Sequence, residues 1–203
     1  MNYLIYMDFE KFWLSQLDLI KWIKKPKIAL KKKKNNFFTW FPDGKINIYS
    51  SCVERHLKNK NKKAIYFVDK NKNITSLTYN ELDIKISKFC SYLIKSSNNK
   101  KINRVMIHTS STMWSAISML SCAKLGIHFS VVFEDLAKEA IKTRIKIFKP
   151  DLVFTVSNNS DLDNFFSKIN DKGIIKVIYF KKIQLEKIPA KKNKTIKDLN
   201  SND

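Results

Sequence analysis

The chain has 203 residues, of which 44% are hydrophobic and 12% aromatic, so it is long and apolar enough to bury a core. No apolar run approaches the length that spans a bilayer, and residues 1–14 carry charged side chains with neither a basic start nor a cleavage site. We therefore expect a cytoplasmic protein of one domain or part of one, with no membrane partner.

The formal net charge of +21 raises the question of nucleic-acid binding. Among 39 basic residues only Arg55, Arg104 and Arg144 are arginine, the side chain best shaped for bidentate contacts with bases and phosphates. The lysines are spread along the chain and do not alternate with aromatic residues as they do in proteins that stack bases. A lysine-rich composition explains this charge without a function, and we expect no nucleic-acid partner.

The three cysteines, Cys52, Cys90 and Cys122, are far apart and lie in periodic apolar segments. This pattern predicts reduced, buried thiols and not a disulfide framework. Cys52 and His56 are four residues apart in a segment with helical spacing, as two metal ligands could be. No third ligand accompanies them, so the pattern favours a structural role for both.

Apolar residues recur at helical spacing from Asp8 to Ile23 and predict an amphipathic helix of about four turns. The aromatic residues of 37–41 are expected to pack together as a plug, and Pro42 and Gly44 mark a turn after them. Residues 47–57 predict a second helix.

A predicted β-hairpin at 64–77 comes next, followed by Thr78-Tyr-Asn-Glu81, which has the capping-box pattern at the start of a helix. Strand and helix patterns then alternate, with Thr109–Thr112 offering hydroxyls to cap a helix and Gly126 ending it. The predicted strands of this series are 104–107, 127–133, 152–156 and 174–180, and the helices between them are 113–123, 136–148 and 162–169.

Four strands that alternate with three helices predict an α/β fold with a parallel, right-handed, doubly wound sheet. We assign residues 58–180 to this α/β subdomain and residues 1–57 to a helical N-terminal extension. Residues 181–203 lose periodicity, are rich in Lys and Asn, and are expected to form a frayed or disordered tail.

The segment Trp40-Phe-Pro-Asp-Gly-Lys-Ile-Asn-Ile-Tyr-Ser-Ser-Cys-Val-Glu-Arg-His-Leu57 resembles the N-terminal signature of acetyl-CoA and propionyl-CoA synthetases, which belong to the adenylate-forming, AMP-binding superfamily. Similar motifs follow in the family's order at Leu77-Thr-Tyr-Asn-Glu-Leu82, Met119-Leu-Ser-Cys-Ala-Lys-Leu-Gly126 and Ser130-Val-Val-Phe133. The resemblance covers residues 9–157. It implies that the sheet is the first subdomain of the acyl-CoA synthetase fold.

Members of this family use ATP and Mg²⁺ to form an acyl-adenylate from a short carboxylate, and then transfer the acyl group to CoA. They do so with a Ser/Thr/Gly-rich loop ending in lysine, later acidic and aromatic motifs, and a C-terminal domain with a catalytic lysine. None of these motifs occurs in the 203 residues. The resemblance therefore implies an N-terminal fragment of an acetate- or propionate-CoA ligase that has no catalytic residue or metal site of its own and is inactive alone.

Two alternatives remain open for such a fragment. It could complement a second polypeptide that carries the rest of the synthetase, in which case the unfinished sheet should expose apolar surface where that polypeptide packs. It could instead be a degenerate, non-catalytic remnant that is retained, if at all, as a binding module.

Phe133 is the one contact with CoA that the resemblance carries over. The family continues with two glycines where the adenine of CoA approaches the backbone, whereas this chain has Glu134 and Asp135. These carboxylates could form an acid/base pair, but adjacent acidic residues that open a helix are ordinary partners of its dipole. His108 and His128 are predicted at strand ends, where open α/β sheets bind ligands, and without a nearby nucleophile packing is the favoured role.

Overall fold

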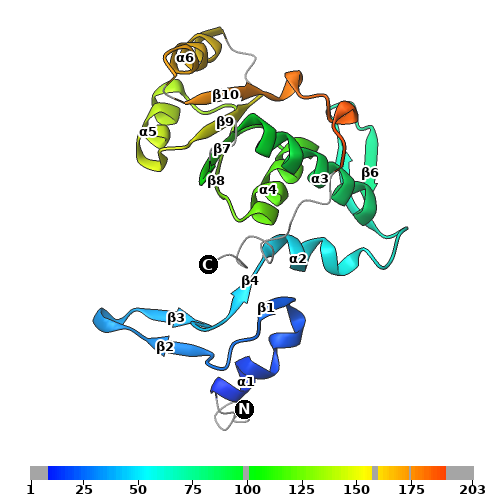
Figure 1. Ribbon diagram of the computed structural model, residues 1–203, viewed down its shortest axis with the longest axis vertical. Helices are drawn as coiled ribbons and strands as arrows, with labels where there is room; N and C mark the ends of the chain where they lie inside the picture. The colour runs from blue at the N-terminus through cyan, green and yellow to red at the C-terminus, as the bar shows by residue number, and fades with distance from the viewer. Residues whose placement is uncertain (1–8, 98–100, 157–159, 174, 191–203) are drawn as a thin grey trace. The chain divides into compact units, whose positions relative to one another are not determined.

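The computed structural model describes residues 9–97, 101–156, 160–173 and 175–190 (Figure 1). The chain divides into two compact units, Met1–Arg55 and His56–Asp203, and each is described by itself. Among the described residues, no helix combines the length and the apolar character needed to cross a membrane.

The first unit consists of short helices and two antiparallel strand pairs, β1 with β4 and β2 with β3. Its helical segments are α1 (Phe9–Ser15), the 3₁₀ helices η1 (Leu17–Leu19) and η2 (Lys34–Asn36), and α2 (Ile48–Cys52), and its strands are β1 (Trp22–Lys24), β2 (Leu30–Lys32), β3 (Phe38–Trp40) and β4 (Lys45–Ile46).

The prediction of one helix from Asp8 to Ile23 was wrong. Asp8 lies outside the described residues, and α1 ends at Ser15. The cause is the role of Trp22, which pairs with β4 as part of a strand, packs its ring 5.3 Å from that of Phe41, and donates its indole N–H to the carbonyl of Leu17. The contacts of Trp22 with β4 and Phe41, which are distant in sequence, outweigh the helical spacing of this segment.

The predicted helix over residues 47–57 is also divided. Asn47 caps α2 by accepting a hydrogen bond from the backbone N–H of Ser50, and a separate 3₁₀ helix, η3 (Glu54–His56), follows Val53. Cys52, at the end of α2, is exposed, so the prediction of a buried thiol was wrong there. The same prediction is confirmed for Cys90 and Cys122.

The predicted aromatic plug is confirmed for only part of its residues. The ring of Trp40 lies 5.1 Å from that of Trp13, and Phe41 contacts Trp22. Phe37 and Phe38 are exposed, so for these two the prediction was wrong. They lie at the tip of the β2–β3 hairpin, where no other aromatic ring of the described chain reaches them.

The second unit contains the predicted parallel sheet, with strand order β10-β9-β7-β8, and a separate hairpin of β5 and β6. The α/β prediction is confirmed, because every neighbouring pair in the four-stranded sheet is parallel and helices separate the strands. The strands are β5 (Lys63–Val68), β6 (Ile74–Thr78), β7 (Arg104–His108), β8 (His128–Val132), β9 (Leu152–Thr155) and β10 (Lys176–Tyr179), and the helices are α3 (Tyr79–Ser96), α4 (Met113–Leu125), α5 (Lys138–Phe148) and α6 (Ser160–Asp171).

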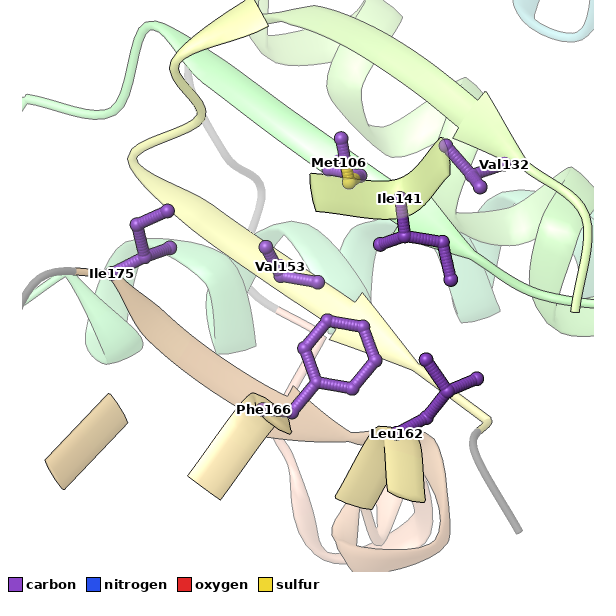
Figure 2. Close-up of a cluster of buried hydrophobic side chains, with 7 residues drawn as sticks. All are labelled: Met106, Val132, Ile141, Val153, Leu162, Phe166 and Ile175. Atoms are coloured by element: carbon purple, nitrogen blue, oxygen red, sulfur yellow. The ribbon is translucent and has the colours of Figure 1, made fainter. Parts of the chain in front are cut away.

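Side chains of successive strand residues point to opposite faces, and helices cover both faces of this sheet. Figure 2 shows the core on the side of α5 and α6, where Phe166 packs beside Val153 and Ile141. On the other face the ring of Phe154 lies 4.9 Å from Phe89 of α3. The remaining members of the first cluster are Met106, Val132, Leu162 and Ile175.

Two of the three predicted helix caps are present in the structure. Thr78 and Glu81 form both hydrogen bonds of the capping box at the start of α3, and Gly126 closes α4 at a φ of 69°. Thr112 is the N-cap residue of α4, but its hydroxyl accepts no backbone N–H, so the predicted hydroxyl cap was wrong. The backbone turn, in which the N–H of Ser115 donates to the carbonyl of Thr112, begins this helix instead.

The predicted tail is ordered in the part that the structure describes. Two 3₁₀ helices, η4 (Phe180–Lys182) and η5 (Leu185–Lys187), follow β10, and Ile183 and Leu185 are buried. The ring of Phe180 stacks on that of Phe154 at 5.5 Å. The prediction of a frayed tail was therefore wrong up to residue 190, because the apolar side chains of Ile183 and Leu185 are buried, and residues 191–203 lie outside the described part.

Candidate functional site

The strand order places a switch point between β7 and β9. The chain leaves β7 through α4 to reach β8 on one side, and leaves β9 through α6 to reach β10 on the other (Figure 1). In open α/β sheets such a point leaves a crevice at the carboxyl ends of the strands, where ligands bind. The carboxyl edge of β7, β8 and β9 is therefore the candidate functional site.

His108 ends β7 at this switch point, and its side chain is fully buried. Its Nδ1 atom lies 2.8 Å from the hydroxyl oxygen of Thr155, the last residue of β9, while Nε2 is buried with no hydrogen-bond partner among the described residues. Burial lowers the pKa of His108, and the backbone and carboxylate of Glu134 act in the opposite direction with smaller effect. The buried position of His108 therefore favours the neutral form of its imidazole.

Backbone hydrogen bonds fix the edge around this histidine. The N–H of Thr109 donates to the carbonyl of Val132, and the N–H of Val156 donates to the carbonyl of His108. The three strands are thereby tied together one residue beyond their regular pairing. The packing role predicted for His108 is confirmed, while Thr155, its partner, was not predicted, although it is a hydroxyl residue in an otherwise apolar strand.

Phe133 follows β8 at the same edge and is 66% exposed. The turn after it is closed by the N–H of Leu136, which donates to the carbonyl of Phe133. Glu134 and Asp135 lie in this turn and are exposed, and α5 begins only at Lys138. The prediction that these two carboxylates open the helix was wrong, because Ala137 is the N-cap residue and Glu139 is the acid of the first turn.

Two other predicted candidates do not contribute to this edge. His128 is exposed at the first residue of β8, which is the amino end of the parallel sheet, so it lies at the opposite edge from the switch point. Cys52 and His56 belong to different helical segments. Within the described ranges no group of three or more His, Cys, Asp or Glu side chains could hold a metal ion.

The arrangement has limited chemistry of its own. The exposed ring of Phe133 can stack on a planar base, as aromatic side chains do with nucleobases. The neighbouring carboxylates of Glu134 and Asp135 repel anions, so this turn does not fit the phosphates of a nucleotide. We derive no reaction step through ATP, Mg²⁺ or CoA at this edge.

Comparison with known proteins identifies the fold and the family. The acetyl-coenzyme A synthetase of Helicobacter pylori (strain P12) is 36% identical over 151 residues, which cover 73% of this chain and 23% of that protein. The acetyl-coenzyme A synthetase of Streptomyces coelicolor is 34% identical over 146 residues. The chain thus spans about a quarter of the length of the curated relatives it matches.

The structure is similar to that of acetoacetyl-CoA synthetase from Streptomyces lividans, with a TM-score of 0.70 and 16% identity over 90% of this chain and 29% of that one. This likeness confirms the acyl-CoA synthetase fold. Two protein-family models match the sequence. The family model of the acetyl-coenzyme A synthetase N-terminus matches residues 6–52, and the family model of the AMP-binding enzyme matches residues 53–202. Because the second match takes up most of the chain, the chain belongs to the AMP-binding enzyme family and carries an acetyl-CoA-synthetase-type N-terminus.

Proposed function

We propose that this chain forms the N-terminal region of an acetate- or propionate-CoA ligase. The observation that carries the proposal is the order of the two family matches, an acetyl-CoA-synthetase N-terminus followed directly by an AMP-binding region, with curated relatives of the same name. The complete ligase would form an acyl-adenylate from ATP with Mg²⁺ and then the acyl-CoA. We place it in the cytoplasm.

We propose further that these residues alone do not catalyse the reaction. Phosphoryl chemistry needs donors that surround the phosphates, commonly backbone N–H groups of a glycine-rich loop. The chain has three glycines, and each has another role. Gly126 and Gly173 take positive φ values just after α4 and α6, and a Cβ at Gly44 would lie 2.7 Å from the ring of Trp22.

The remaining catalytic parts would come from additional protein, and we propose that it packs beside β8. Among the described strands β8 has a neighbour on one side only, as edge strands do, and Val131 within it and Phe133 just after it expose apolar side chains. A second polypeptide carrying the later motifs of the synthetase fits this edge. Phe133 would then be covered and could contact the adenine of CoA.

The experiment combines the chain with the part of the H. pylori acetyl-CoA synthetase that lies beyond the matched region. We expect no acetate-dependent pyrophosphate release from either piece and measurable release from the mixture. Val131→Lys should abolish the gain by placing a charge on the edge strand, next to the shared edge, whereas Ile147→Lys, which places the same charge at an exposed position of α5, should not. Turnover by the chain alone, or equal effects of the two variants, would contradict the proposal.

A degenerate binding module is the second candidate, and the acidic turn favours it. Glu134 and Asp135 stand where the family has glycines, and they disfavour an anionic ligand next to Phe133. Calorimetric titration of the chain with CoA and with ATP separates the two candidates. Binding of CoA that is lost in Phe133→Ala supports the ligase region, and absence of heat with both ligands supports the remnant.

A further inference from the structure

The β2–β3 hairpin carries a feature that lies outside the AMP-binding region. Leu30 pairs with Trp40 and Lys32 with Phe38, and the N–H of Lys33 donates to the carbonyl of Phe37 to close the ladder. Within the first unit, Figure 1 shows the hairpin as an arm that extends away from α1 and β1. Asn36 turns the chain at its tip with a φ of 58°.

The tip is strongly basic. Lys31–Lys34 are four consecutive exposed lysines, and none of them forms an ion pair with another residue that the structure describes. The sequence from residue 19 to residue 42 contains no acidic residue at all. Elsewhere in this unit lysines do have partners, since Lys21 and Lys25 contact carboxylates. The hairpin tip therefore holds a local excess of positive charge that nothing described compensates.

The tip is also apolar. Phe37 is 71% exposed and Phe38 is 54% exposed, directly beside the lysines. Exposure of two adjacent phenylalanines costs solvation free energy and indicates a surface that becomes covered. Only Asn35 and Asn36 separate the lysines from the phenylalanines along the chain, and the register of the hairpin also places Lys32 opposite Phe38.

We propose that this basic and aromatic tip docks on the surface of an anionic phospholipid bilayer. Lysines attract anionic headgroups, and phenylalanine rings enter the boundary between headgroups and acyl chains. Such a contact needs no segment that spans the membrane, so it is compatible with the absence of a spanning helix among the described residues. The expectation of no membrane partner rested on spanning length, and that criterion does not address a contact with the bilayer surface.

A bilayer fits the geometry better than a nucleic acid does. Phe37 and Phe38 are consecutive in extended backbone, so their side chains point to opposite sides and cannot form one platform for stacked bases. Both rings can nevertheless enter an interface that surrounds the tip. The cations are all lysines, which act as point charges, and the hairpin contains no arginine for bidentate contacts.

The test is co-sedimentation of the full chain with vesicles of phosphatidylcholine, with or without about one third phosphatidylserine, at about 0.15 M salt. We expect binding to the anionic vesicles only. The variant Lys31→Gln, Lys32→Gln, Lys33→Gln, Lys34→Gln should bind about a hundredfold more weakly. The variant Phe37→Ala, Phe38→Ala should bind about tenfold more weakly at unchanged charge.

Matched controls separate the hairpin from the total charge of the protein. Substituting glutamine at Lys58, Lys60, Lys70 and Lys72, four exposed lysines of the second unit, removes the same charge and should weaken binding less than about fivefold. Tyr66→Ala, which removes another exposed ring, should have no effect. Circular dichroism confirms that each variant is folded.

Two results would overturn the proposal. Equal losses in the hairpin and control lysine variants would show that vesicles respond only to net charge. Fluorescence anisotropy with a single-stranded oligothymidylate provides the second test. If that oligonucleotide binds at the same salt through the hairpin residues while the vesicles do not, the tip is a nucleic-acid contact and not a lipid contact.

Discussion

The Nδ1 atom of His108 lies 2.8 Å from the hydroxyl oxygen of Thr155, so side chains as well as backbone join β7 to β9 at the switch point of the sheet. The histidine is fully buried, and its burial lowers its pKa below the ordinary value of 6.5. The folded protein therefore holds a neutral imidazole where the unfolded chain would accept a proton at mildly acidic pH.

This difference predicts a pH dependence of stability. Below pH 6.5 and above the lowered pKa of His108, the imidazole binds more protons in the unfolded chain than in the folded chain, by at most one. The free energy of unfolding should therefore fall as the pH falls through this window, by up to about 1.4 kcal/mol per pH unit. Urea unfolding of the wild type and of His108→Gln at a series of pH values measures the difference in slope.

His108→Gln should flatten this slope, even if it also lowers stability at every pH. The same slope in the variant and in the wild type would mean that the folded chain protonates His108 as readily as the unfolded chain does.

A second prediction compares two threonines at N-cap positions. The hydroxyl of Thr78 accepts the N–H of Glu81 in a complete capping box, whereas the hydroxyl oxygen of Thr112 is buried and has no hydrogen-bond partner among the residues that the structure describes. Thr78→Ala should lower the free energy of unfolding by about 1 kcal/mol. Thr112→Ala should change it by less than about 0.5 kcal/mol or raise it, because no hydrogen bond is lost. Thermal unfolding of both variants measures the two losses of stability. A larger loss in Thr112→Ala than in Thr78→Ala would contradict the prediction.

These caps show which features a single sequence determines. The capping box of Thr78 and Glu81 and the left-handed Gly126 depend on residues within one turn, so they could be predicted. The alternation of apolar strands and helices likewise predicted the parallel sheet. The prediction of a helix from Asp8 to Ile23 was wrong because Trp22 pairs with Ile46 in a strand. The spacing of apolar residues along the chain does not reveal such a contact between distant residues.

The candidate site was predictable to a similar extent. Phe133 and His108 could be placed at the carboxyl edge from the strand pattern and the family resemblance. Thr155 could not, because its pairing with His108 depends on which strands are neighbours, and the order β7-β9 is set by the crossovers. His128 could have been excluded, since it begins its predicted strand and carboxyl ends of parallel strands share one edge.

A third prediction concerns the buried cation between α3 and α4. The ammonium of Lys124 lies 3.0 Å from Oδ1 of Asp83 and 2.9 Å from the hydroxyl of Ser87, and the lysine side chain is 7% exposed. Lys124→Met should lower the free energy of unfolding by about 1–3 kcal/mol, because it leaves a partly buried carboxylate without this cation. Asp83→Asn in the same protein should restore part of the loss. Urea unfolding of the two single variants and the double variant measures the coupling, and strictly additive losses would contradict it.

The last prediction links the core to the site. Phe166 of α6 is fully buried in the cluster of Figure 2, and its ring lies 5.6 Å from that of His108. Phe166→Ala should lower the free energy of unfolding by about 3–5 kcal/mol, whereas Ile147→Ala, at a side chain that is 77% exposed, should change it by less than about 0.5 kcal/mol.

The same cavity should act on the histidine. Removing the ring of Phe166 lets water approach the imidazole, which reduces the desolvation that lowers the pKa of His108. Phe166→Ala should therefore raise this pKa and flatten the dependence of stability on pH. The more conservative Phe166→Leu should keep the pKa of His108 and the pH dependence closer to those of the wild type. Proton NMR titration of the imidazole C–H resonances measures the pKa in each variant. A pKa of His108 that stays at its wild-type value in Phe166→Ala would mean that the sheet, and not α6, excludes water from the switch point.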